Sequence, residues 1–349
     1  MCNIQMLYPH IKGRSMADLK IDKHLIEWKD VSEHTWDSLL LGNGFSMNIW
    51  ERFGYPDLFK LAKSSKVGNP LEDQSIALFD HLSISNFEDV LRILYHAKIV
   101  DDQLGSPQKN EIECLYENTK NALASAVTYA HIPPNSIDAS AINNELREYT
   151  NVFTTNYDLI PYWSIMEKLE GFKDYFWDDG NCFDTSNTKT GPRDTNIHYL
   201  HGAIHLVELS NGKTKKLTAN GLAQLSELFD LTRREQFPLF LAEGTSEWKL
   251  ARINRNDYLR FCYEKLGKIN GGLVVLGHSL HKDFDQHIID TVNTSDASRI
   301  AIGVWPHQND EDIVSFKARL ALNLPNKERY FFNSQTHPLG AISLNVSLE

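Results

Sequence analysis

The sequence predicts an α/β fold: a Rossmann-like, largely parallel sheet with a large all-helical insertion. Three observations support this prediction. Short apolar runs rich in β-branched or aromatic residues are typical of buried strands. Several of these runs precede segments with helical periodicity, as βα units do. The long region between the first two runs is helical in pattern almost throughout.

The predicted strands share a short apolar core and a polar or glycine-containing end. They are residues 38–42, 151–155, 197–206, 238–242, 273–277, 299–304 and 329–332. After the third of them, residues 205–217 predict a β-hairpin, because Asn211 and Gly212 supply a two-residue turn.

The predicted organisation has an extension, a sheet domain and an insertion. Residues 1–30 form an N-terminal extension, and residues 31–56 together with 149–349 form the Rossmann-like domain. Residues 57–148 form the helical insertion, in which apolar residues recur near every third or fourth position. A chain of 349 residues is long enough to bury a core in such an arrangement.

Composition and charge exclude several classes of partner. The net formal charge is −11, which disfavours binding to nucleic acid or to anionic membranes. No apolar run approaches the roughly 20 residues that span a bilayer, and the first 30 residues show no signal-peptide pattern. We therefore expect a cytoplasmic protein. The cysteines are scattered at Cys2, Cys114, Cys182 and Cys262, so a zinc ribbon is not expected.

The segment LLLGNGFSMNIW predicts a strand that ends in two glycines. Gly42 and Gly44 flank Asn43, and Phe45 and Ser46 follow at the start of a helix. Backbone N–H groups at such a helix start bind phosphate oxygens, and glycine allows a close approach because it has no Cβ. The alternative is an ordinary strand-to-helix turn that Ser46 caps.

A second polar group follows the strand at 151–155. Thr155, Asn156 and Asp158 come at its end. In an open α/β sheet, polar groups just past the carboxyl end of a strand lie in the ligand crevice. The alternative is that Asn156 and Asp158 cap the helix that begins near Leu159.

The segment HYLHGAIHL contains three histidines and raises the question of a metal site. In a continuous strand, His198 and His201 point to opposite faces, and His201 and His205 lie about 13 Å apart. That separation is too long for one ion. His201, which precedes Gly202, is therefore interpreted as an acid/base group at a bend in the strand. The alternative is a histidine with only a structural hydrogen bond.

The strand at 273–277 ends in a further polar cluster. Gly277 and Ser279 come first, and the following histidines and aspartates are His278, His281, Asp283, Asp285 and His287. Histidines and aspartates are also the residue types that bind metal ions, so a metal site is one interpretation of this cluster. The preferred interpretation places the aspartates in the first turn of a helix, where the helix dipole favours them, and leaves the histidines mostly solvated.

In chain order, the segments G-N-G-F-S, T-T-N-Y-D, H-G and G-H-S-L each follow a predicted strand. This order resembles the sirtuin-like superfamily, where the segments are G-A-G-[IV]-S, T-Q-N-[IV]-D, H-G and G-[TS]-S-L. The resemblance covers about residues 38–305 and does not extend to the helical insertion. Five segments (LLLGNGFS, FTTNYDL, YLHGAIHL, AEGTSEWKLARI and VVLGHSL) are similar to a bacterial sirtuin-like family long described as of unknown function.

Two features depart from the sirtuin deacylases. The hairpin at 205–217 stands where those enzymes carry a four-cysteine zinc ribbon, and Thr155 replaces their Gln. The ribbon helps to build the acyl-lysine cleft. The resemblance therefore implies only the half of the machinery that binds and breaks NAD, without zinc. Sirtuin-like domains of bacterial antiviral systems that lack the ribbon act as NAD hydrolases.

The resemblance also implies a site for NAD as the substrate. Asn156 would orient the ribose hydroxyls and the attacking water, Asp158 would accept from the nicotinamide carboxamide, and His201 would be the general base. The other residues that would contact the dinucleotide are Gly42, Asn43, Gly44, Phe45, Ser46, Thr155, Gly277 and Ser279. No resident metal is expected.

The expected activity is that of an NAD glycohydrolase in an antiviral effector. A non-catalytic module that senses NAD or an ADP-ribose derivative is the first alternative, and a protein deacylase is the second. We expect a homo-oligomer, because large helical insertions often provide oligomer contacts, and a partner ATPase is a further candidate.

Overall fold

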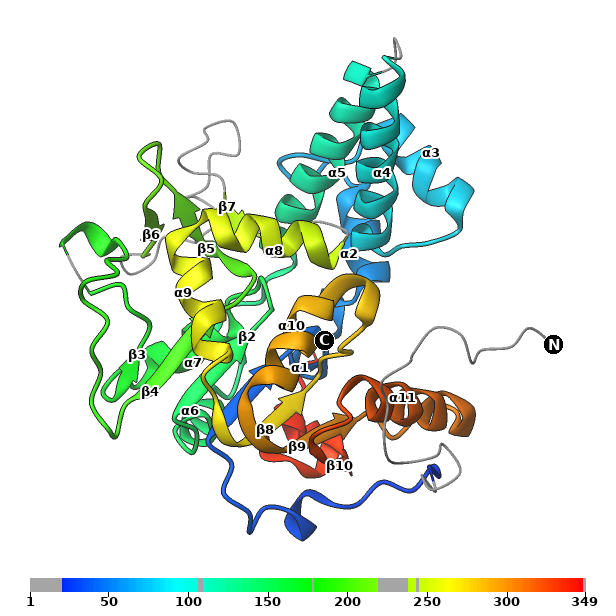
Figure 1. The fold of residues 1–349 in the computed structure, drawn as a ribbon. Coiled ribbons are helices and arrows are strands. Elements are labelled where there is room, and N and C mark those ends of the chain that lie inside the picture. The colour runs from blue at the N-terminus through cyan, green and yellow to red at the C-terminus, as the bar shows by residue number, and fades with distance from the viewer. Residues whose placement is uncertain (1–20, 106–108, 178, 219–237, 243–244, 348–349) are drawn as a thin grey trace.

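The computed structural model describes residues 21–105, 109–177, 179–218, 238–242 and 245–347 (Figure 1). The predicted Rossmann-like α/β fold is confirmed. A parallel sheet has the strand order β10-β9-β8-β1-β2-β4-β3. Its strands are β1 (Ser38–Leu41), β2 (Asn151–Thr154), β3 (Phe172–Lys173), β4 (Thr195–Tyr199), β8 (Asn270–Leu276), β9 (Asp296–Val304) and β10 (Glu328–Asn333).

The strand order reverses between β1 and β8. β1 pairs with β2 on one side and with β8 on the other, so that Leu41 lies opposite both Thr154 and Leu276. Leu39, Leu40 and Leu41 are fully buried, as expected for a central strand covered on both faces. The reversal is the place where open α/β sheets bind ligands, outside the carboxyl ends of the strands.

The segment between β1 and β2 is helical, as predicted. Its helices are α1 (Asn43–Ile49), α2 (Tyr55–Ala62), α3 (Asp73–Leu82), α4 (Phe87–Leu104), α5 (Lys109–Ala130) and α6 (Ala139–Leu146). α4 and α5 lie side by side and rise from the top of the molecule in Figure 1. The side chain of Asn86 caps the start of α4, and Gly105 ends it with a φ of +61°. The first turn of α4 lies beside the sheet domain, because Glu88 contacts Lys249 and Tyr157.

One predicted strand is wrong. Residues 197–206 form two strands, because the chain turns at Leu200 and His201 and Gly202 has a φ of +73°. β5 (Gly202–Glu208) leaves the main sheet and pairs with β6 (Thr214–Lys216) and β7 (Pro238–Phe240) in a second, antiparallel sheet. A Cβ on residue 202 would lie 2.0 Å from the carbonyl oxygen of Leu239, so only glycine fits.

The same second sheet corrects one prediction and confirms another. The segment at 238–242 was expected in the main sheet, but its strand β7 pairs with β5 instead. The hairpin at 205–217 is confirmed, with Glu208 opposite Thr214 and Gly212 at a φ of +80°. The predicted two-residue turn is wrong in length: the N–H of Leu209 donates to the carbonyl oxygen of Lys213, so the chain turns through Ser210, Asn211 and Gly212.

The remaining helices are α7 (Ile160–Glu167), α8 (Ser246–Arg255), α9 (Asp257–Leu266), α10 (Lys282–Thr294) and α11 (Asp310–Asn323). Of these, α7, α10 and α11 follow strands of the main sheet, whereas α8 and α9 lie in the chain between β7 of the second sheet and β8. Short 3-10 segments lie at Trp28–Asp30, Glu51–Phe53, Pro134–Ser136, Asp179–Asn181, Ser334–Thr336, Pro338–Gly340 and Ile342–Leu344.

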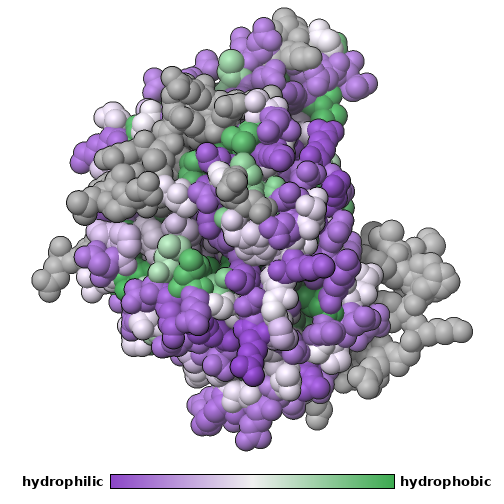
Figure 2. Space-filling model, turned by 90° about the vertical axis from the view of Figure 1, so that its left-hand side faces the viewer, coloured by the Kyte–Doolittle hydropathy of each residue, from purple (hydrophilic) through white to green (hydrophobic). Residues whose placement is uncertain are grey.

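Hydrophilic residues predominate on the face that Figure 2 shows. Across the ranges described here, no helix has the length and apolar character needed to cross a bilayer.

Candidate active site

Loops from the carboxyl ends of four strands surround a cavity of about 290 Å³. The loops after β1, β2 and β8 and the turn after β4 contribute Asn43, Thr155, Asn156, Tyr157, Asp158, His201, Gly277, His278 and Ser279. The helical insertion supplies much of the opposite wall, through Tyr55, Leu58, Asn86, Glu88, Leu123 and Val127. The cavity therefore lies at the strand-order reversal, between the sheet domain and the insertion.

Asn156 belongs to a buried chain of hydrogen bonds. Its Nδ2 donates to Oγ of Ser46 at 2.7 Å, and that hydroxyl donates to Oδ2 of Asp158 at 2.6 Å. Asn156 is 3 % exposed, and its Oδ1 has no hydrogen-bond partner. An unpaired buried acceptor costs folding free energy, on the order of 1–3 kcal/mol. The side chain is thus held with one acceptor left for a donor that comes from elsewhere.

Asp158 contacts both the start of α7 and this network. It is the residue before the N-cap Leu159, which itself has no side-chain cap, and its Oδ1 accepts from the backbone N–H of Ile160 at 2.9 Å. Burial raises the pKa of Asp158 to about 6, although the hydrogen bonds from Ser46 and Ile160 counteract part of that rise. The carboxyl group is therefore mostly ionised at neutral pH.

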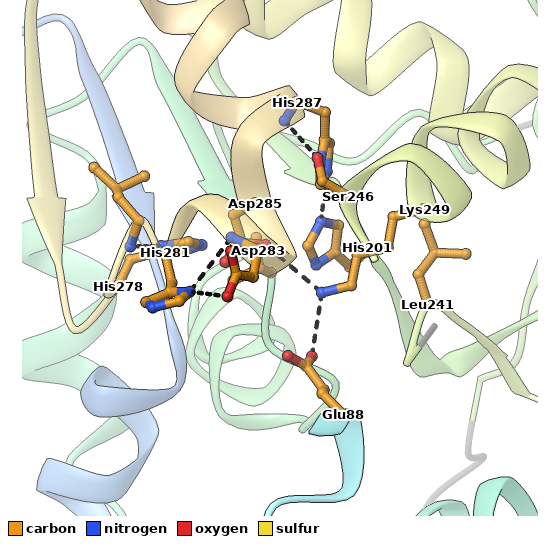
Figure 3. Close-up of polar contacts among 12 residues, drawn as sticks. Glu88, His201, Leu241, Ser246, Lys249, His278, His281, Asp283, Asp285 and His287 are labelled. Atoms are coloured by element: carbon orange, nitrogen blue, oxygen red, sulfur yellow. Dashed lines mark hydrogen bonds and ion pairs between the residues drawn. The ribbon is translucent and has the colours of Figure 1, made fainter. Parts of the chain in front are cut away.

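His201 lies in the turn after β4 and contacts a second histidine. Its Nε2 is 3.1 Å from Nε2 of His287 on α10. The other ring nitrogen of His287, Nδ1, is 2.9 Å from Oγ of Ser246, which also accepts the backbone N–H of His287 at 2.7 Å (Figure 3). Burial above all holds the pKa of His201 well below 6.5, and the positive charge of Lys249 adds to that effect. His201 is therefore neutral at physiological pH.

An ion triad borders the same cavity, with Lys249 and Asp285 buried and Glu88 partly buried. Nζ of Lys249 lies 3.3 Å from Oε1 of Glu88 and 3.6 Å from Oδ1 of Asp285 (Figure 3). Glu88 comes from α4 of the insertion, Lys249 from α8 and Asp285 from α10. The hydroxyl of Tyr157 also donates to Glu88, at 3.1 Å. The triad joins the insertion to the sheet domain beside His201.

Burial and the ammonium group act in opposite directions on the two carboxyl groups of the triad. Burial raises the pKa of Glu88, and Lys249 offsets only part of that rise. Burial also pushes the pKa of Asp285 upward, but the positive charge of Lys249 acts in the opposite direction, and the net shift is downward. Asp285 is therefore the more strongly ionised partner of Lys249.

The glycines after β1 and β8 pack against each other. A Cβ on Gly42 would lie 2.6 Å from the carbonyl oxygen of Gly277, and one on Gly277 would lie 2.1 Å from the backbone nitrogen of Phe45. The N–H of Gly44 donates to the carbonyl oxygen of Gly277 at 2.8 Å, and the N–H of Gly42 donates to that of Leu276 at 3.0 Å. Glycine is thus required here to bring two backbone loops together.

A second cavity, of about 620 Å³, lies on the other side of these glycines. Gly44, Phe45 and Gly277 line it, together with apolar and aromatic residues that include Trp305 and Ile342. Trp305 is 45 % exposed, so its ring is accessible from solvent. Gly277 lines both cavities.

The structure distributes the predicted site residues between these cavities. The first contains Asn43, Thr155, Asn156, Asp158, His201, Gly277 and Ser279 in its lining, and the second contains Gly44 and Phe45. Gly42 and Ser46 line neither cavity. Ser46 instead joins Asn156 to Asp158.

Comparison with known proteins gives a family and a fold likeness. Residues 39–338 match a family described as "Domain of unknown function (DUF4917)". The chain belongs to this family. No curated protein matches it. A solved structure described as "Structural Basis for the Mechanism and Regulation of Sir2 Enzymes" is similar over 90 % of this chain and 92 % of that chain, with 12 % identity and a TM-score of 0.30. A likeness at that level carries no information about function.

Sequence reasoning missed four residues beside the cavity of this DUF4917 chain: Glu88, Ser246, Lys249 and His287. The interpretation that the histidines after β8 are mostly solvated is wrong for His278 and His287, which are 8 % and 3 % exposed. Ser246 and Lys249 lie in the segment AEGTSEWKLARI, which carried part of the resemblance but received no role. Glu88 lies in the insertion, where only helical periodicity was visible.

One group of side chains in the DUF4917 site has the donor types of a metal centre. The ligand atoms of His201, Asp285 and His287 lie within 4.8 Å of one another, and imidazole with carboxylate is a common zinc set. The ammonium group of Lys249, however, already lies 3.6 Å from Asp285 and would repel a cation there. The Nε2 atoms of the two histidines also face each other at hydrogen-bond distance. We interpret the group as a hydrogen-bonded network.

Proposed function

We propose that this protein is an NAD hydrolase. It cleaves the bond between nicotinamide and ribose with water, and it yields nicotinamide, ADP-ribose and a proton. The observation that supports this function best is the unpartnered Oδ1 of Asn156, buried in the cavity that neutral His201 also lines. Two neighbouring acceptors suit a ligand with several O–H donors, such as a ribose diol with an incoming water.

The charges around the first cavity fit the transition state of this reaction. Positive charge develops on the ribose as the nicotinamide leaves. Glu88, Asp158 and Asp285 provide carboxyl groups in the lining, against the single ammonium group of Lys249. Preorganised negative charge near a developing cation lowers its energy in a site that excludes water. In this proposal Asn156 positions a ribose hydroxyl and the water, and His201 takes the proton that the water loses.

The two cavities suit a dinucleotide. NAD has two nucleosides that are joined by a pyrophosphate, and Gly277 lines both cavities. We propose that the nicotinamide ribose occupies the first cavity and the adenosine the second, with the pyrophosphate crossing at Gly277. The backbones of Gly44 and Gly277 are in direct contact between the two spaces, so the pyrophosphate would pass across the surface of these packed loops and not between them.

Incubation of the purified protein with NAD tests the proposal. We expect equal amounts of nicotinamide and ADP-ribose by chromatography, and no release above background from Asn156→Ala. Binding of NAD without cleavage by the wild type would contradict the proposal and favour the sensing module. Nicotinamide release that requires an acetylated peptide would contradict it in favour of deacylation.

We further propose, from the resemblance, that NAD loss serves antiviral defence and that the active form is a homo-oligomer. Bacteria that carry the wild-type gene should lose cellular NAD and restrict phage growth on infection, whereas His201→Ala should do neither. Light scattering of the purified protein measures the oligomeric state, and a monomer that cleaves NAD at the full rate would contradict the second part.

A further inference from the structure

The loop between β8 and α10, residues 277–281, forms part of the first cavity. Its lining residues are Gly277, His278, Ser279 and His281. Leu280, between the last two of them, has a buried side chain and a backbone φ of +46°. The left-handed region is unfavourable for a residue that carries a Cβ, above all for a bulky one. Contacts around the loop must therefore compensate for this conformation.

Arg319 on α11 holds the loop from the side of that helix. Its Nη1 donates to the carbonyl oxygen of Leu280 at 2.5 Å, and its Nη2 donates to that of Ser279 at 2.8 Å. These two carbonyl groups belong to the planar peptide units on either side of the Leu280 Cα, and φ and ψ of Leu280 describe the rotations of those units. One guanidinium group therefore fixes the strained residue.

Other contacts orient both the arginine and the loop. The guanidinium carbon of Arg319 lies 5.2 Å from the ring centroid of Phe316, one turn earlier on α11. Within the loop, the backbone N–H of Leu280 donates to Nδ1 of His278 at 3.0 Å. Hydrogen bonds from a charged donor are roughly twice as strong as those between neutral groups. Arg319 lines neither cavity, so its effect on a ligand passes through the loop.

We propose that Arg319 is a positioning residue that keeps the loop after β8 in the conformation that brings Gly277 and Ser279 to the cavity wall. For its effect on catalysis the inference rests on the proposed function, in which the pyrophosphate of NAD crosses at Gly277. Loss of Arg319 lowers the fraction of molecules that have the competent loop, and the apparent affinity for the ligand falls by the same factor. Turnover of bound substrate changes little, because Asn156 and His201 come from other loops.

Hydrogen exchange tests the positioning without reference to activity. Arg319→Met removes the guanidinium group and retains an unbranched apolar side chain. We expect the peptide that covers residues 277–284 to exchange about tenfold faster in this variant than in the wild type, whereas residues 270–276 of β8 exchange as before. Equal exchange of residues 277–284 in the two proteins overturns the inference, whatever the protein does with NAD.

Kinetics test the consequence for the substrate. We expect Arg319→Met to raise KM for nicotinamide release from NAD about tenfold, with kcat changed less than twofold. Arg319→Lys keeps the positive charge but lacks the planar fork that reaches two carbonyl groups, so it should raise KM only about threefold. A fall in kcat at an unchanged KM overturns the inference, because loop positioning acts on binding.

Arg329→Met is the matched control. The guanidinium group of Arg329 also donates to two backbone carbonyl groups, those of Leu324 and Lys327, in the connection between α11 and β10. None of these three residues lines either cavity. We therefore expect Arg329→Met to keep the wild-type KM and the wild-type exchange of residues 277–284. An equal rise in KM in the two methionine variants overturns the inference, because the effect would then be one of general stability.

A second variant protects the test from a folding defect. If Arg319→Met does not fold, both measurements use Arg319→Lys, and wild-type KM with wild-type exchange in that variant overturns the inference while leaving NAD hydrolysis intact. Faster exchange of the loop in the variant of a protein that cleaves no NAD supports the positioning role and overturns the proposed function instead.

Discussion

The two cavities that meet at Gly277 differ in chemistry. The first is lined by the unpaired amide oxygen of Asn156, by neutral His201 and by an ion triad with little solvent exposure. The second is lined largely by apolar and aromatic groups, and its tryptophan is accessible to solvent. Bond cleavage needs fixed polar groups shielded from water, whereas holding a flat base needs mainly an accessible ring. If the protein cleaves NAD as proposed, this difference assigns the reaction to the first cavity and recognition of the base to the second.

The largest expected effect comes from substitutions in the first cavity. Asn156→Ala and His201→Ala should each lower kcat for nicotinamide release by about 10²- to 10⁴-fold while the fold stays intact, as circular dichroism would check. His81→Ala, at an exposed histidine of α3 that lines neither cavity, is the control. If His201→Ala cleaves NAD at the wild-type rate, His201 is not the general base.

Substitution of Gly277, which lines both cavities, should reduce the stability of the fold. Gly277→Ala should lower the free energy of unfolding by about 2 kcal/mol or more, because φ is +69° and the new Cβ would meet the backbone of Phe45. Urea unfolding measures the change. Gly68→Ala is the control, because no atom lies within 4 Å of its Cβ position. Equal stability of both variants would contradict the close packing of the two glycine loops.

The second cavity should affect binding more than turnover. Trp305→Ala should raise KM for NAD about tenfold, since stacking of one base on an aromatic ring is worth on the order of 1–3 kcal/mol. Its kcat should be nearly unchanged, and cleavage of nicotinamide mononucleotide, which lacks the adenosine, should be unaffected. Trp177→Ala, another exposed tryptophan, is the control. A fall in kcat with an unchanged KM would reverse the roles of the two cavities.

The smallest effect concerns the ionisation of Asp158. Its pKa of about 6 means that acidification through pH 6 protonates it, and a protonated carboxyl group holds the hydroxyl of Ser46 less firmly. Activity should therefore fall about tenfold per pH unit below 6 and stay level above it. Asp158→Asn should flatten this limb, whereas the exposed Asp257→Asn should leave it unchanged. If the fall in activity below pH 6 persists in Asp158→Asn, a group other than Asp158 causes it.

Much of the fold could be predicted because the sequence pattern of each segment agrees with the strand or helix that the segment forms in the sheet domain. Apolar runs located the central strands, and glycine or polar residues marked their ends. The break at His201 could not be predicted, because residues 197–206 are apolar enough to pass for one strand. It requires the contact between Gly202 and Leu239, which lies far along the chain.

The candidate site was predictable only for residues that follow strands. Parallel strands bring their carboxyl ends together, so Asn156, His201 and Gly277 could be expected near one another. Glu88 and Ser246 come from helices whose docking no local pattern indicates. The burial of His287 depends on the contact between α8 and α10, and the sequence alone shows only a helix with several charged residues.

The proposed reaction requires Asn156 and His201 to contact the same ribose. A crystal structure of the protein with ADP-ribose tests this most directly. We predict that the distal ribose donates a hydroxyl hydrogen bond to Oδ1 of Asn156 within reach of Nδ1 of His201, while the adenine lies against Trp305. A ribose bound outside the first cavity, with that Oδ1 still unpartnered, would contradict the account.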